Sequence, residues 1–346
     1  MAEALPSTGA PVLVTGATGF LGRHLLRALL RQNRRVVAVV RDEAGLSAAF
    51  PGIEIIRSDV RDVAGYCSRL EPGMTVFHLA GTRALPGTRR EEFRRVNVDA
   101  TLALARAAAQ AGAGRFMHIS TALVYGCASG APADETVPLR APAFPSGYLE
   151  SRLEGLRQVR NLVVQGLPVV TLCPTIVFGP DTPDHPNRLA RQMRRLLRRR
   201  LDVVIGGGAQ RRTVAFVDDV VRGMILAEAR GAPGEEYILG GHDVSPREFN
   251  CLVPAAARAT PRLRLSVPAW AVRIVARGAD RCRGFERGCG YETALDMYSQ
   301  EWCYRSSKAV SGIGYGVTPI GQALAETVRA LAPQQAPVAE SEARAG

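Results

Sequence analysis

Three glycines near the start of the chain have the spacing of a phosphate-binding turn. Gly16, Gly19 and Gly22 directly follow the short apolar run Pro11–Thr15. The first glycine permits a tight turn, the second lets the backbone approach a pyrophosphate, and the third lets the following helix pack closely on the strand. Free N–H groups at the start of that helix would attract the phosphates. This pattern predicts a dinucleotide site.

The residue after the next apolar run bears on which dinucleotide binds. Val36–Val40 is β-branched and buried in character, and Arg41 follows it. An acidic residue at this point would bind the ribose 2′-hydroxyl of NAD, whereas a guanidinium suits the 2′-phosphate of NADP. Arg41 could equally be a solvated arginine in an arginine-rich chain. We therefore predict NADP as the cofactor, with NAD as the alternative.

These residues must be positioned by alternating strands and helices. The turn lies between the strand-like run Pro11–Thr15 and a stretch from Phe20 whose apolar residues recur at helical spacing. Further strand-like runs, with helical stretches such as Asn97–Ala111 between them, are Ile53–Ile56, Thr75–Leu79, Arg115–Ser120 and Val169–Cys173. The alternation predicts an α/β fold with a doubly wound parallel sheet, the Rossmann architecture.

The alternation loosens beyond Pro174, which predicts a second, smaller region. We expect residues 10–178 to form the Rossmann NADP-binding domain and residues 213–240 to return to it. Residues 179–212 and 241–331 would form a C-terminal substrate-binding region. The termini, residues 1–9 and 333–346, lack periodic apolar positions and are expected to be disordered.

Charge and cysteine content narrow the function classes. The formal net charge is +12, and Lys308 is the single lysine among 44 basic residues. A basic chain suits anionic small molecules, acidic carrier proteins or nucleic acid, but no zinc-finger or aromatic RNA-binding pattern supports nucleic acid. The seven cysteines form no Cys-x-x-Cys pair and are expected to be reduced thiols, with no metal bound.

No apolar run approaches the roughly 20 residues of a membrane span. The N-terminus also lacks a basic and then apolar signal-peptide pattern. These features predict a chain without a membrane span and a cytoplasmic location.

With the glycine turn in place, an ordered series of motifs resembles the extended short-chain dehydrogenase/reductase family, also described as the NAD-dependent epimerase/dehydratase superfamily. The motifs are Thr15–Gly22, Asp59–Asp62, His78–Gly81, Asn97–Val98, Ser120–Gly126, Pro174–Pro180 and Phe216–Val220. Within that family, Val40–Asp42, Tyr237–Gly241 and Ser306–Ala309 look most like the dihydroflavonol reductase branch. The hopanoid-associated epimerase-like proteins and the 3β-hydroxysteroid dehydrogenase relatives are neighbours of that branch.

The resemblance implies a set of site residues. Asp59 and Val60 would contact the adenine, and Thr121, Tyr148 and Arg152 would be catalytic. The full set implied to bind the cofactor is Gly16, Thr18, Gly19, Phe20, Leu21, Gly22, Arg41, Asp59, Val60, Leu79, Ala80, Gly81, Asn97, Tyr148, Arg152, Pro174, Thr175 and Ile176. Tyrosine would supply the proton for ketone reduction, Thr121 would hydrogen-bond the oxygen, and a nearby cation would favour the phenolate.

The chain departs from the family at that cation. The family places lysine four residues after the tyrosine, whereas this chain has Arg152. Arginine keeps the positive charge, but its planar guanidinium is bulkier and cannot shuttle a proton. Either Arg152 is a compositional replacement in a working enzyme, which we favour, or the chain binds a dinucleotide with weakened catalysis.

The resemblance leaves two reactions open. Dehydratases of the family carry an acidic pair where this chain has Ala122 and Leu123, so dehydration is disfavoured. A reductase acting on a bulky small-molecule ketone, or a dehydrogenase acting on its alcohol, is expected. The alternative is a nucleotide-sugar epimerase, because Arg212 lies seven residues before Asp219, where such enzymes bind a diphosphate.

Two further segments suggest partners. Asn187–Arg200 predicts an amphipathic helix with an arginine face, which could dock an acidic carrier protein or bind substrate phosphates, or could simply be solvated. The alanine-rich stretch Thr101–Ala111 suits the helix pairing of a homodimer.

Overall fold

The computed structural model describes residues 8–43, 45–126, 130–181, 187–198, 201–258 and 263–331. Apart from Thr8 and Gly9, the termini for which disorder was predicted lie outside these described residues.

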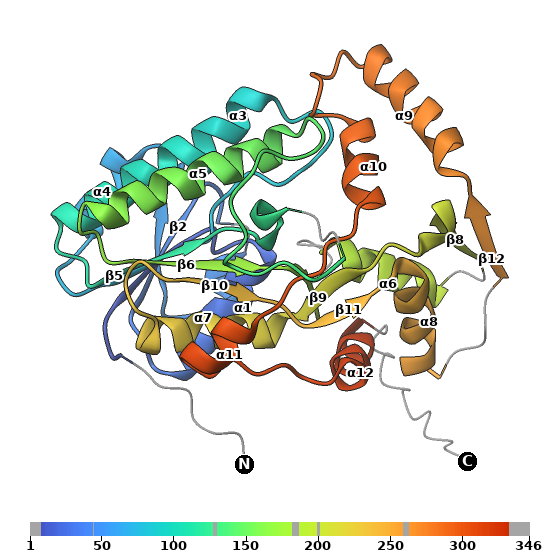
Figure 1. The fold of residues 1–346 in the computed structure, drawn as a ribbon. Coiled ribbons are helices and arrows are strands. Elements are labelled where there is room, and N and C mark those ends of the chain that lie inside the picture. The colour runs from blue at the N-terminus through green and yellow to red at the C-terminus, as the bar shows by residue number, and fades with distance from the viewer. Residues whose placement is uncertain are drawn as a thin grey trace, which may run out of the picture.

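Within the described residues, seven parallel strands form the central sheet (Figure 1). In spatial order they are β10 (Glu236–Leu239), β6 (Val169–Pro174), β5 (Arg115–Ile119), β4 (Thr75–His78), β1 (Val12–Thr15), β2 (Val36–Val40) and β3 (Glu54–Arg57). Except for the edge strand β3, they are short and almost wholly buried, which explains why they read as continuous apolar runs. The order outward from β1 reverses direction between β1 and β4, as in a doubly wound sheet. The predicted α/β fold is confirmed.

Helices cover both faces of this sheet, as Figure 1 shows. The helices α1 (Phe20–Arg31) and α7 (Val217–Arg230) pack on one face, and α4 (Thr101–Gln110) and α5 (Gly147–Val164) pack on the other. The shorter elements of this part are α2 (Leu46–Ala49), α3 (Arg90–Arg94), the π-helical turn Arg95–Ala100, α11 (Ser307–Ile313) and the 3₁₀ turns Val63–Gly65, Cys67–Arg69 and Ala122–Tyr125. Each face therefore has its own apolar core.

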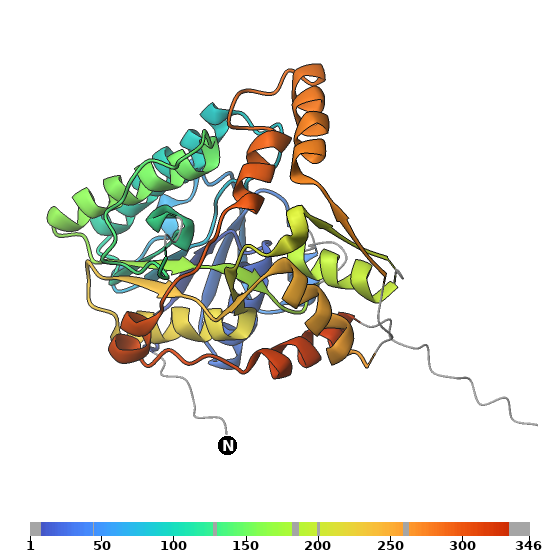
Figure 2. The same cartoon turned by 45° about the vertical axis from the view of Figure 1, so that its right-hand side comes forward.

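Smaller sheets lie beyond the carboxyl edge of β6. One joins β7 (Ile176–Phe178), β9 (Arg212–Phe216) and β11 (His242–Val244), and the other joins β8 (Leu201–Ile205) and β12 (Leu263–Val267). Around them lie the 3₁₀ turn Gly206–Gly208, α6 (Arg188–Arg198), α8 (Pro246–Ala256), α9 (Ala269–Cys282), α10 (Tyr291–Ser299) and α12 (Ile320–Leu331). Figure 2 shows this part beside the carboxyl edge of the central sheet.

The return of the chain to the main sheet begins later than residue 213. Strand β9 pairs with β7 and β11 in the smaller sheet, whereas α7 packs against α1 and β10 pairs with β6. The apolar spacing of β9 does not distinguish the two sheets, because both bury the strand.

The alanine-rich helix α4 turns most of its apolar residues inward. Leu104, Ala105 and Ala108 are fully buried in the chain's own core, while Arg106 and Gln110 are exposed. The homodimer expected from this segment stays a prediction. Among the described residues, no helix has both the length and the apolarity to cross a bilayer.

Candidate active site

The predicted cofactor residues follow the carboxyl ends of six neighbouring strands. The glycine turn follows β1, Arg41 follows β2, Asp59 and Val60 follow β3, and Leu79–Gly81 follow β4. Thr121 follows β5, and Pro174–Ile176 lie at the end of β6. The carboxyl ends of parallel strands share one edge of a sheet, and ligands of open α/β sheets bind there. Residues up to 160 positions apart in the sequence are thus gathered along one edge.

The glycine turn is packed so tightly that side chains are excluded. Gly16 has φ 71°, and a Cβ there would lie 2.7 Å from the backbone nitrogen of Ala80. A Cβ on Gly22 would overlap the carbonyl oxygen of Gly16 and approach the Cα of Ala17 to 2.8 Å. A Cβ on Gly19 would lie 3.1 Å from the Gly16 oxygen, and Gly19 itself is exposed. The turn therefore presents bare backbone at the start of α1.

Two arginines lie close to Asp59 at the far end of this edge. Arg61 binds the Asp59 carboxylate with two hydrogen bonds of 2.9 Å from Nε and Nη2. The hydrogen bond from Arg61, with smaller contributions that include the charge of Arg41, lowers the pKa of Asp59. Arg41 is exposed directly after β2. Sequence reasoning singled out Arg41 and missed Arg61, which the Asp59–Asp62 motif contains.

Tyr148 and Arg152 lie one helical turn apart near the start of α5, so both side chains point to the same side of the helix. The guanidinium carbon of Arg152 lies 5.6 Å from the centroid of the Tyr148 ring. Phe93 packs edge-on against that ring at 6.1 Å. Ser146 caps the helix by accepting a hydrogen bond from the backbone of Leu149. The first turn of α5 is therefore fixed by its cap and its packing.

Arg152 reaches from α5 to the sheet edge. Its Nη1 donates to the carbonyl oxygen of Ile119, at 3.4 Å, and its Nη2 lies against Gly81, where a Cβ would overlap it. Its Nε is buried and has no hydrogen-bond partner among the described residues. The bulkier guanidinium is accommodated because position 81 has no side chain. A ligand bound at the sheet edge could accept a hydrogen bond from this buried Nε.

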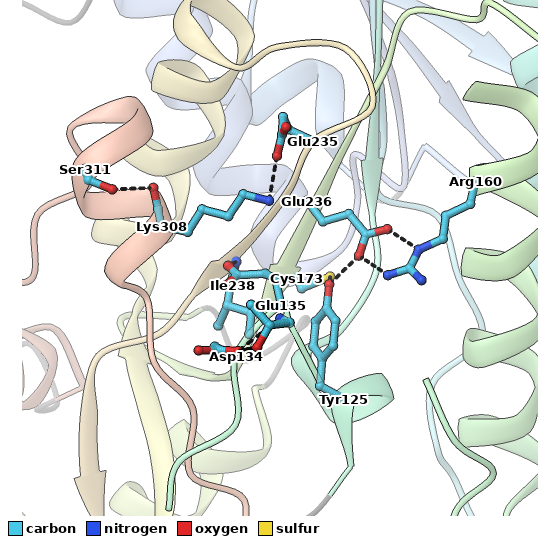
Figure 3. Close-up of polar contacts among 11 residues, drawn as sticks. Tyr125, Asp134, Glu135, Arg160, Cys173, Glu235, Glu236, Ile238, Lys308 and Ser311 are labelled. Carbon is cyan, nitrogen blue, oxygen red and sulfur yellow. Dashed lines mark hydrogen bonds and ion pairs between the residues drawn. The ribbon is translucent and has the colours of Figure 1, made fainter. Parts of the chain in front are cut away.

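Thr121 begins the 3₁₀ turn Ala122–Tyr125, and its Oγ1 accepts a hydrogen bond from the backbone of Leu123 at 3.4 Å. The far end of this turn is anchored by Tyr125, whose hydroxyl donates to Glu236 on β10 at 2.5 Å (Figure 3). Arg160 on α5 holds the same carboxylate at 2.6 and 2.8 Å. This network ties the turn that carries Thr121 to both the sheet and α5. Sequence reasoning missed Glu236, because nothing local links it to a tyrosine 111 residues away.

Asn97 lies within the π-helical turn Arg95–Ala100, a deviation from the regular helix that the sequence predicts. Its side chain is buried, accepts from the backbone of Thr82 at 2.8 Å and donates to Ser151 Oγ at 2.9 Å. Asn97 therefore joins the loop after β4 to α5. In this structure it orders the elements that carry Gly81 and Arg152.

His78, at the end of β4, is a buried structural histidine. One ring nitrogen lies 2.8 Å from Thr15 Oγ1 and the other 2.9 Å from Thr101 Oγ1, which links β1, β4 and α4. Burial, with a smaller contribution from the charge of Arg152, lowers the pKa of His78 to about 3. Burial also lowers the pKa of its neighbour His118 well below the usual value. Both rings are neutral at physiological pH.

A cavity of about 390 Å³ opens beside Tyr148 and Arg152. Its walls come from α5, β7, α6, β9, α8 and α10, so a helix that covers the central sheet and the three-stranded smaller sheet both contribute. Most of the lining is apolar or aromatic, including Leu123, Phe249, Met297 and Trp302. The charged residues lining it are Arg83, Arg152, Arg188 and Arg212, with no aspartate or glutamate among them.

Arg212 is placed at this cavity by β9. Its guanidinium carbon lies 4.6 Å from the centroid of the Tyr298 ring, and Nη2 donates to the Tyr298 carbonyl oxygen at 2.6 Å. Its Nε is buried without a partner among the described residues. Burial lowers the pKa of Arg212, and the charge of Arg188 contributes in the same direction. Sequence reasoning missed Arg83, which belongs to no motif, whereas Arg188 lies in the arginine-rich segment Asn187–Arg200, for which binding of substrate phosphates was one expectation.

The residues along the sheet edge fit a dinucleotide. The glycine turn presents backbone without side chains at the start of α1, and the loop Leu79–Gly81 lies beside Gly16. Two more buried hydroxyls at strand ends, Ser120 Oγ and Thr175 Oγ1, have no partner among the described residues. Among the residues that the structure describes, no cluster of His, Cys, Asp and Glu could hold a metal ion.

Comparisons with known proteins agree with this geometry. The model of the NAD dependent epimerase/dehydratase family matches residues 12–240. A 3 beta-hydroxysteroid dehydrogenase/Delta 5-->4-isomerase of Mycobacterium tuberculosis is 28% identical over 323 residues, covering 88% of this chain and 85% of the relative. A putative dihydroflavonol 4-reductase of Synechocystis is 28% identical over 325 residues, covering 91% of this chain and 92% of the relative.

A solved structure with the same fold is the UDP-glucose 4-epimerase of Thermus thermophilus in complex with NAD. It matches with a TM-score of 0.75 and 22% identity, over 94% of this chain and 100% of that chain. At 94% of this chain, the match is not confined to the central sheet.

Proposed function

The chain belongs to the NAD dependent epimerase/dehydratase family, and from that premise we propose that it is an NADP(H)-dependent reductase of a bulky ketone, or the dehydrogenase of its alcohol. One observation carries this proposal: Tyr148 and Arg152 line a largely apolar cavity, and Arg152 also lies against the cofactor loop at Gly81.

The chain's own residues would hold the dinucleotide at the sheet edge. The turn Gly16–Gly22 would bind the pyrophosphate, with Thr18, Phe20 and Leu21 at the start of α1. The remaining contacts are assigned to Asp59, Val60, Leu79, Ala80, Gly81, Asn97, Pro174, Thr175 and Ile176. When bound, the nicotinamide supplies or accepts the hydride at the carbonyl carbon.

Tyr148 would supply the proton. Its hydroxyl donates to the ketone oxygen as negative charge develops there, and Thr121 donates a hydrogen bond to the same oxygen. The positive charge of Arg152, 5.6 Å from the Tyr148 ring, stabilises the phenolate that remains. A guanidinium stays protonated in proteins, so Arg152 stabilises this charge without relaying the proton.

The preference for NADP would come from the end of β2. Arg41 is exposed there, and Arg61 binds Asp59 after the neighbouring strand β3. Asp42 follows Arg41 directly, and Asp59, after the neighbouring strand β3, is bound by two hydrogen bonds from Arg61. The exposed guanidinium of Arg41 is the feature that would favour a 2′-phosphate over a 2′-hydroxyl.

The substrate would be mainly apolar with an anionic group. Aromatic and aliphatic side chains form most of the cavity, which suits a bulky ring system. Arg212 and Arg188 bring positive charge to the same cavity with no lining carboxylate to offset it. An anionic group of the substrate would satisfy the unpaired Nε of Arg212.

A second candidate function is favoured by Arg212. Its place in the cavity suits a diphosphate, as in a nucleotide-sugar epimerase that holds its dinucleotide through the reaction. Purified protein with bound dinucleotide and no net NADPH consumption on a sugar nucleotide would support epimerisation. If the chain is a reductase, Arg212→Met should weaken the binding of anionic substrates and leave the binding of uncharged ketones unchanged.

Two associations are also proposed. The chain would act as a homodimer, and the arginine face of α6 would meet substrate phosphates or an acidic carrier protein. On α6, Ala190, Met193 and Leu196 are buried, and Arg191, Arg195 and Arg198 are exposed with no ion-pair partner among the described residues.

The test is a titration with NADPH and NADH, followed by a panel of aromatic ketones, aliphatic ketones and sugar nucleotides. We expect NADPH binding and ketone-dependent NADPH consumption by the wild type. The Tyr148→Phe variant should retain NADPH binding and lose on the order of a hundredfold or more in kcat. If the wild type binds NADPH but turns over no ketone, and Arg152→Lys gains activity, the chain is a dinucleotide-binding protein with weakened catalysis.

A further inference from the structure

Helix α9 exposes large apolar side chains at the outer edge of the molecule. Trp270 is 68% exposed, Ile274 63% and Val275 71%. These residues recur at helical spacing on one side of α9, which stands at the upper right in Figures 1 and 2. A contiguous exposed stripe of this kind marks a surface that meets something other than water.

The residues of α9 that form ion pairs face the other way. Arg273 binds Asp296 at 2.7 Å on the neighbouring helix α10, and Asp280 accepts hydrogen bonds from the backbone of Tyr291 and Glu292. A surface helix normally buries its apolar side and exposes its charged residues to solvent. In α9 the ion pairs face the protein and the tryptophan faces out.

Two more large apolar side chains are exposed on the strand pair that leads into α9. Leu265 on β12 is 51% exposed, and its direct partner in the ladder, Val203 on β8, is 52% exposed. Strand β12 leads into α9 through Pro268. Large apolar side chains are therefore exposed both on α9 and on the strand pair that leads into it.

Charge identifies the partner. On the outward side of α9, Arg281 is exposed, whereas Arg277 is exposed but forms an ion pair with Glu292 of α10 at 2.6 Å, and the one acidic residue of α9, Asp280, faces α10. The chain as a whole has a net charge of +12. Tryptophan with arginine beside an apolar stripe is the composition of helices that lie in the interface of an anionic bilayer.

The position of α9 also suits this partner. Its inner side packs on α10, and Met297 and Tyr298 of α10 line the substrate cavity. The helix pair is therefore a wall between the outward apolar surface and the cavity.

We infer that the outward side of α9, with Trp270, Ile274 and Val275, docks the protein on an anionic lipid surface. This inference goes beyond the proposed reaction and does not depend on it. Because a bilayer face lies next to a wall of the cavity, the surface would bring lipid-dissolved substrates close to Tyr148.

The tryptophans give a direct readout. The sequence has Trp270, which is exposed, and Trp302, which is 3% exposed and keeps its environment. Subtracting the spectrum of Trp270→Phe from that of the wild type isolates the emission of Trp270. We expect this emission to shift to the blue with phosphatidylglycerol-containing vesicles and not with pure phosphatidylcholine vesicles, and the shift to weaken as salt is added.

The substitution test uses glutamine, which supports helices. The triple variant Trp270→Gln, Ile274→Gln, Val275→Gln should lower the vesicle partition coefficient on the order of a hundredfold. A matched control replaces exposed valines elsewhere, Val164→Gln on α5 and Val310→Gln on α11, and should bind vesicles as the wild type does. Circular dichroism and NADPH binding check that the triple variant is folded.

Three outcomes would overturn the inference. The wild type could fail to bind phosphatidylglycerol vesicles, or the folded triple variant could bind them unchanged. Alternatively, the emission of Trp270 could already be blue without vesicles and move to the red on dilution, which would show that a second copy of the chain covers α9. Each readout is independent of turnover, so failure here leaves the proposed reaction standing, and an inactive enzyme leaves the vesicle result standing.

Discussion

The guanidinium of Arg152 rests on the bare backbone of Gly81. A Cβ at position 81 would overlap Nη2 and lie 3.0 Å from Cζ. The loop after β4 and the first turns of α5 thus fit together only because a large cation faces a residue without a side chain. The departure from lysine at position 152 is therefore accommodated locally.

This contact predicts the effect of Gly81→Ala. The added methyl group would displace Arg152 from the sheet edge and lower kcat/KM about tenfold to a hundredfold. In an Arg152→Lys background the slimmer side chain should recover most of this loss, and a double-mutant cycle measures the coupling. Gly321→Ala on α12, where a Cβ has no neighbour within 4 Å, is the control. Equal losses in both backgrounds would refute the contact.

Cofactor choice is tested at Arg41. Arg41→Ser removes the exposed guanidinium after β2, so the Kd for NADPH should rise about tenfold while that for NADH stays the same. Calorimetry with both dinucleotides measures the two constants. Arg106→Ser, an exposed arginine on α4, should change neither. A parallel loss of NADH affinity would show that Arg41 acts on the fold and not on the 2′-phosphate.

Stability should fall in mild acid because of His78. Its pKa is about 3 in the folded protein, against an ordinary value of 6.5, so the unfolded chain binds more protons between these pH values. The contribution is fully present above pH 6.5 and is lost as the pH falls toward 3, by up to about 1.4 kcal/mol per pH unit. Urea unfolding of the wild type and His78→Gln over this range should give a shallower slope for the variant. Identical slopes would disprove a neutral buried ring.

Tyr125→Phe tests the anchor of the Thr121 turn. Loss of the hydrogen bond to Glu236 should lower the free energy of unfolding by about 1 to 3 kcal/mol and also reduce kcat, because the turn loosens. Tyr315→Phe removes another buried hydroxyl, bonded to the Gly240 carbonyl at 2.8 Å, and serves as the control. The Tyr315→Phe variant should lower the free energy of unfolding without changing kcat at saturating substrate. If both variants keep full kcat, the Tyr125 network is structural only.

The strands of the central sheet can be predicted from the sequence because a parallel strand that is buried on both faces is a nearly continuous apolar run. Val36–Val40 and Val169–Pro174 are mostly apolar in the sequence because both strands are buried on both faces. The close approach at Gly16 and Gly22 is likewise encoded locally, since no other residue fits.

Contacts between distant segments escape sequence reasoning. The pairing of Tyr125 with Glu236 spans 111 residues, and neither residue signals the other. The π-helical turn at Asn97 is also missed, because its apolar spacing differs little from that of a regular helix. The outward side of α9 is missed because periodicity shows that a helix has two faces but not which face the protein covers.

The pairing of β10 with β6 has a consequence for biosynthesis. Strands β1 to β6 have been translated once Pro174 is added. Strand β10, which pairs with the open edge of β6, is complete only at Leu239. Until those later residues are translated, the nascent sheet presents β6 as an open edge that a neighbouring polypeptide could join. Chaperone demand during synthesis should therefore be concentrated in that interval.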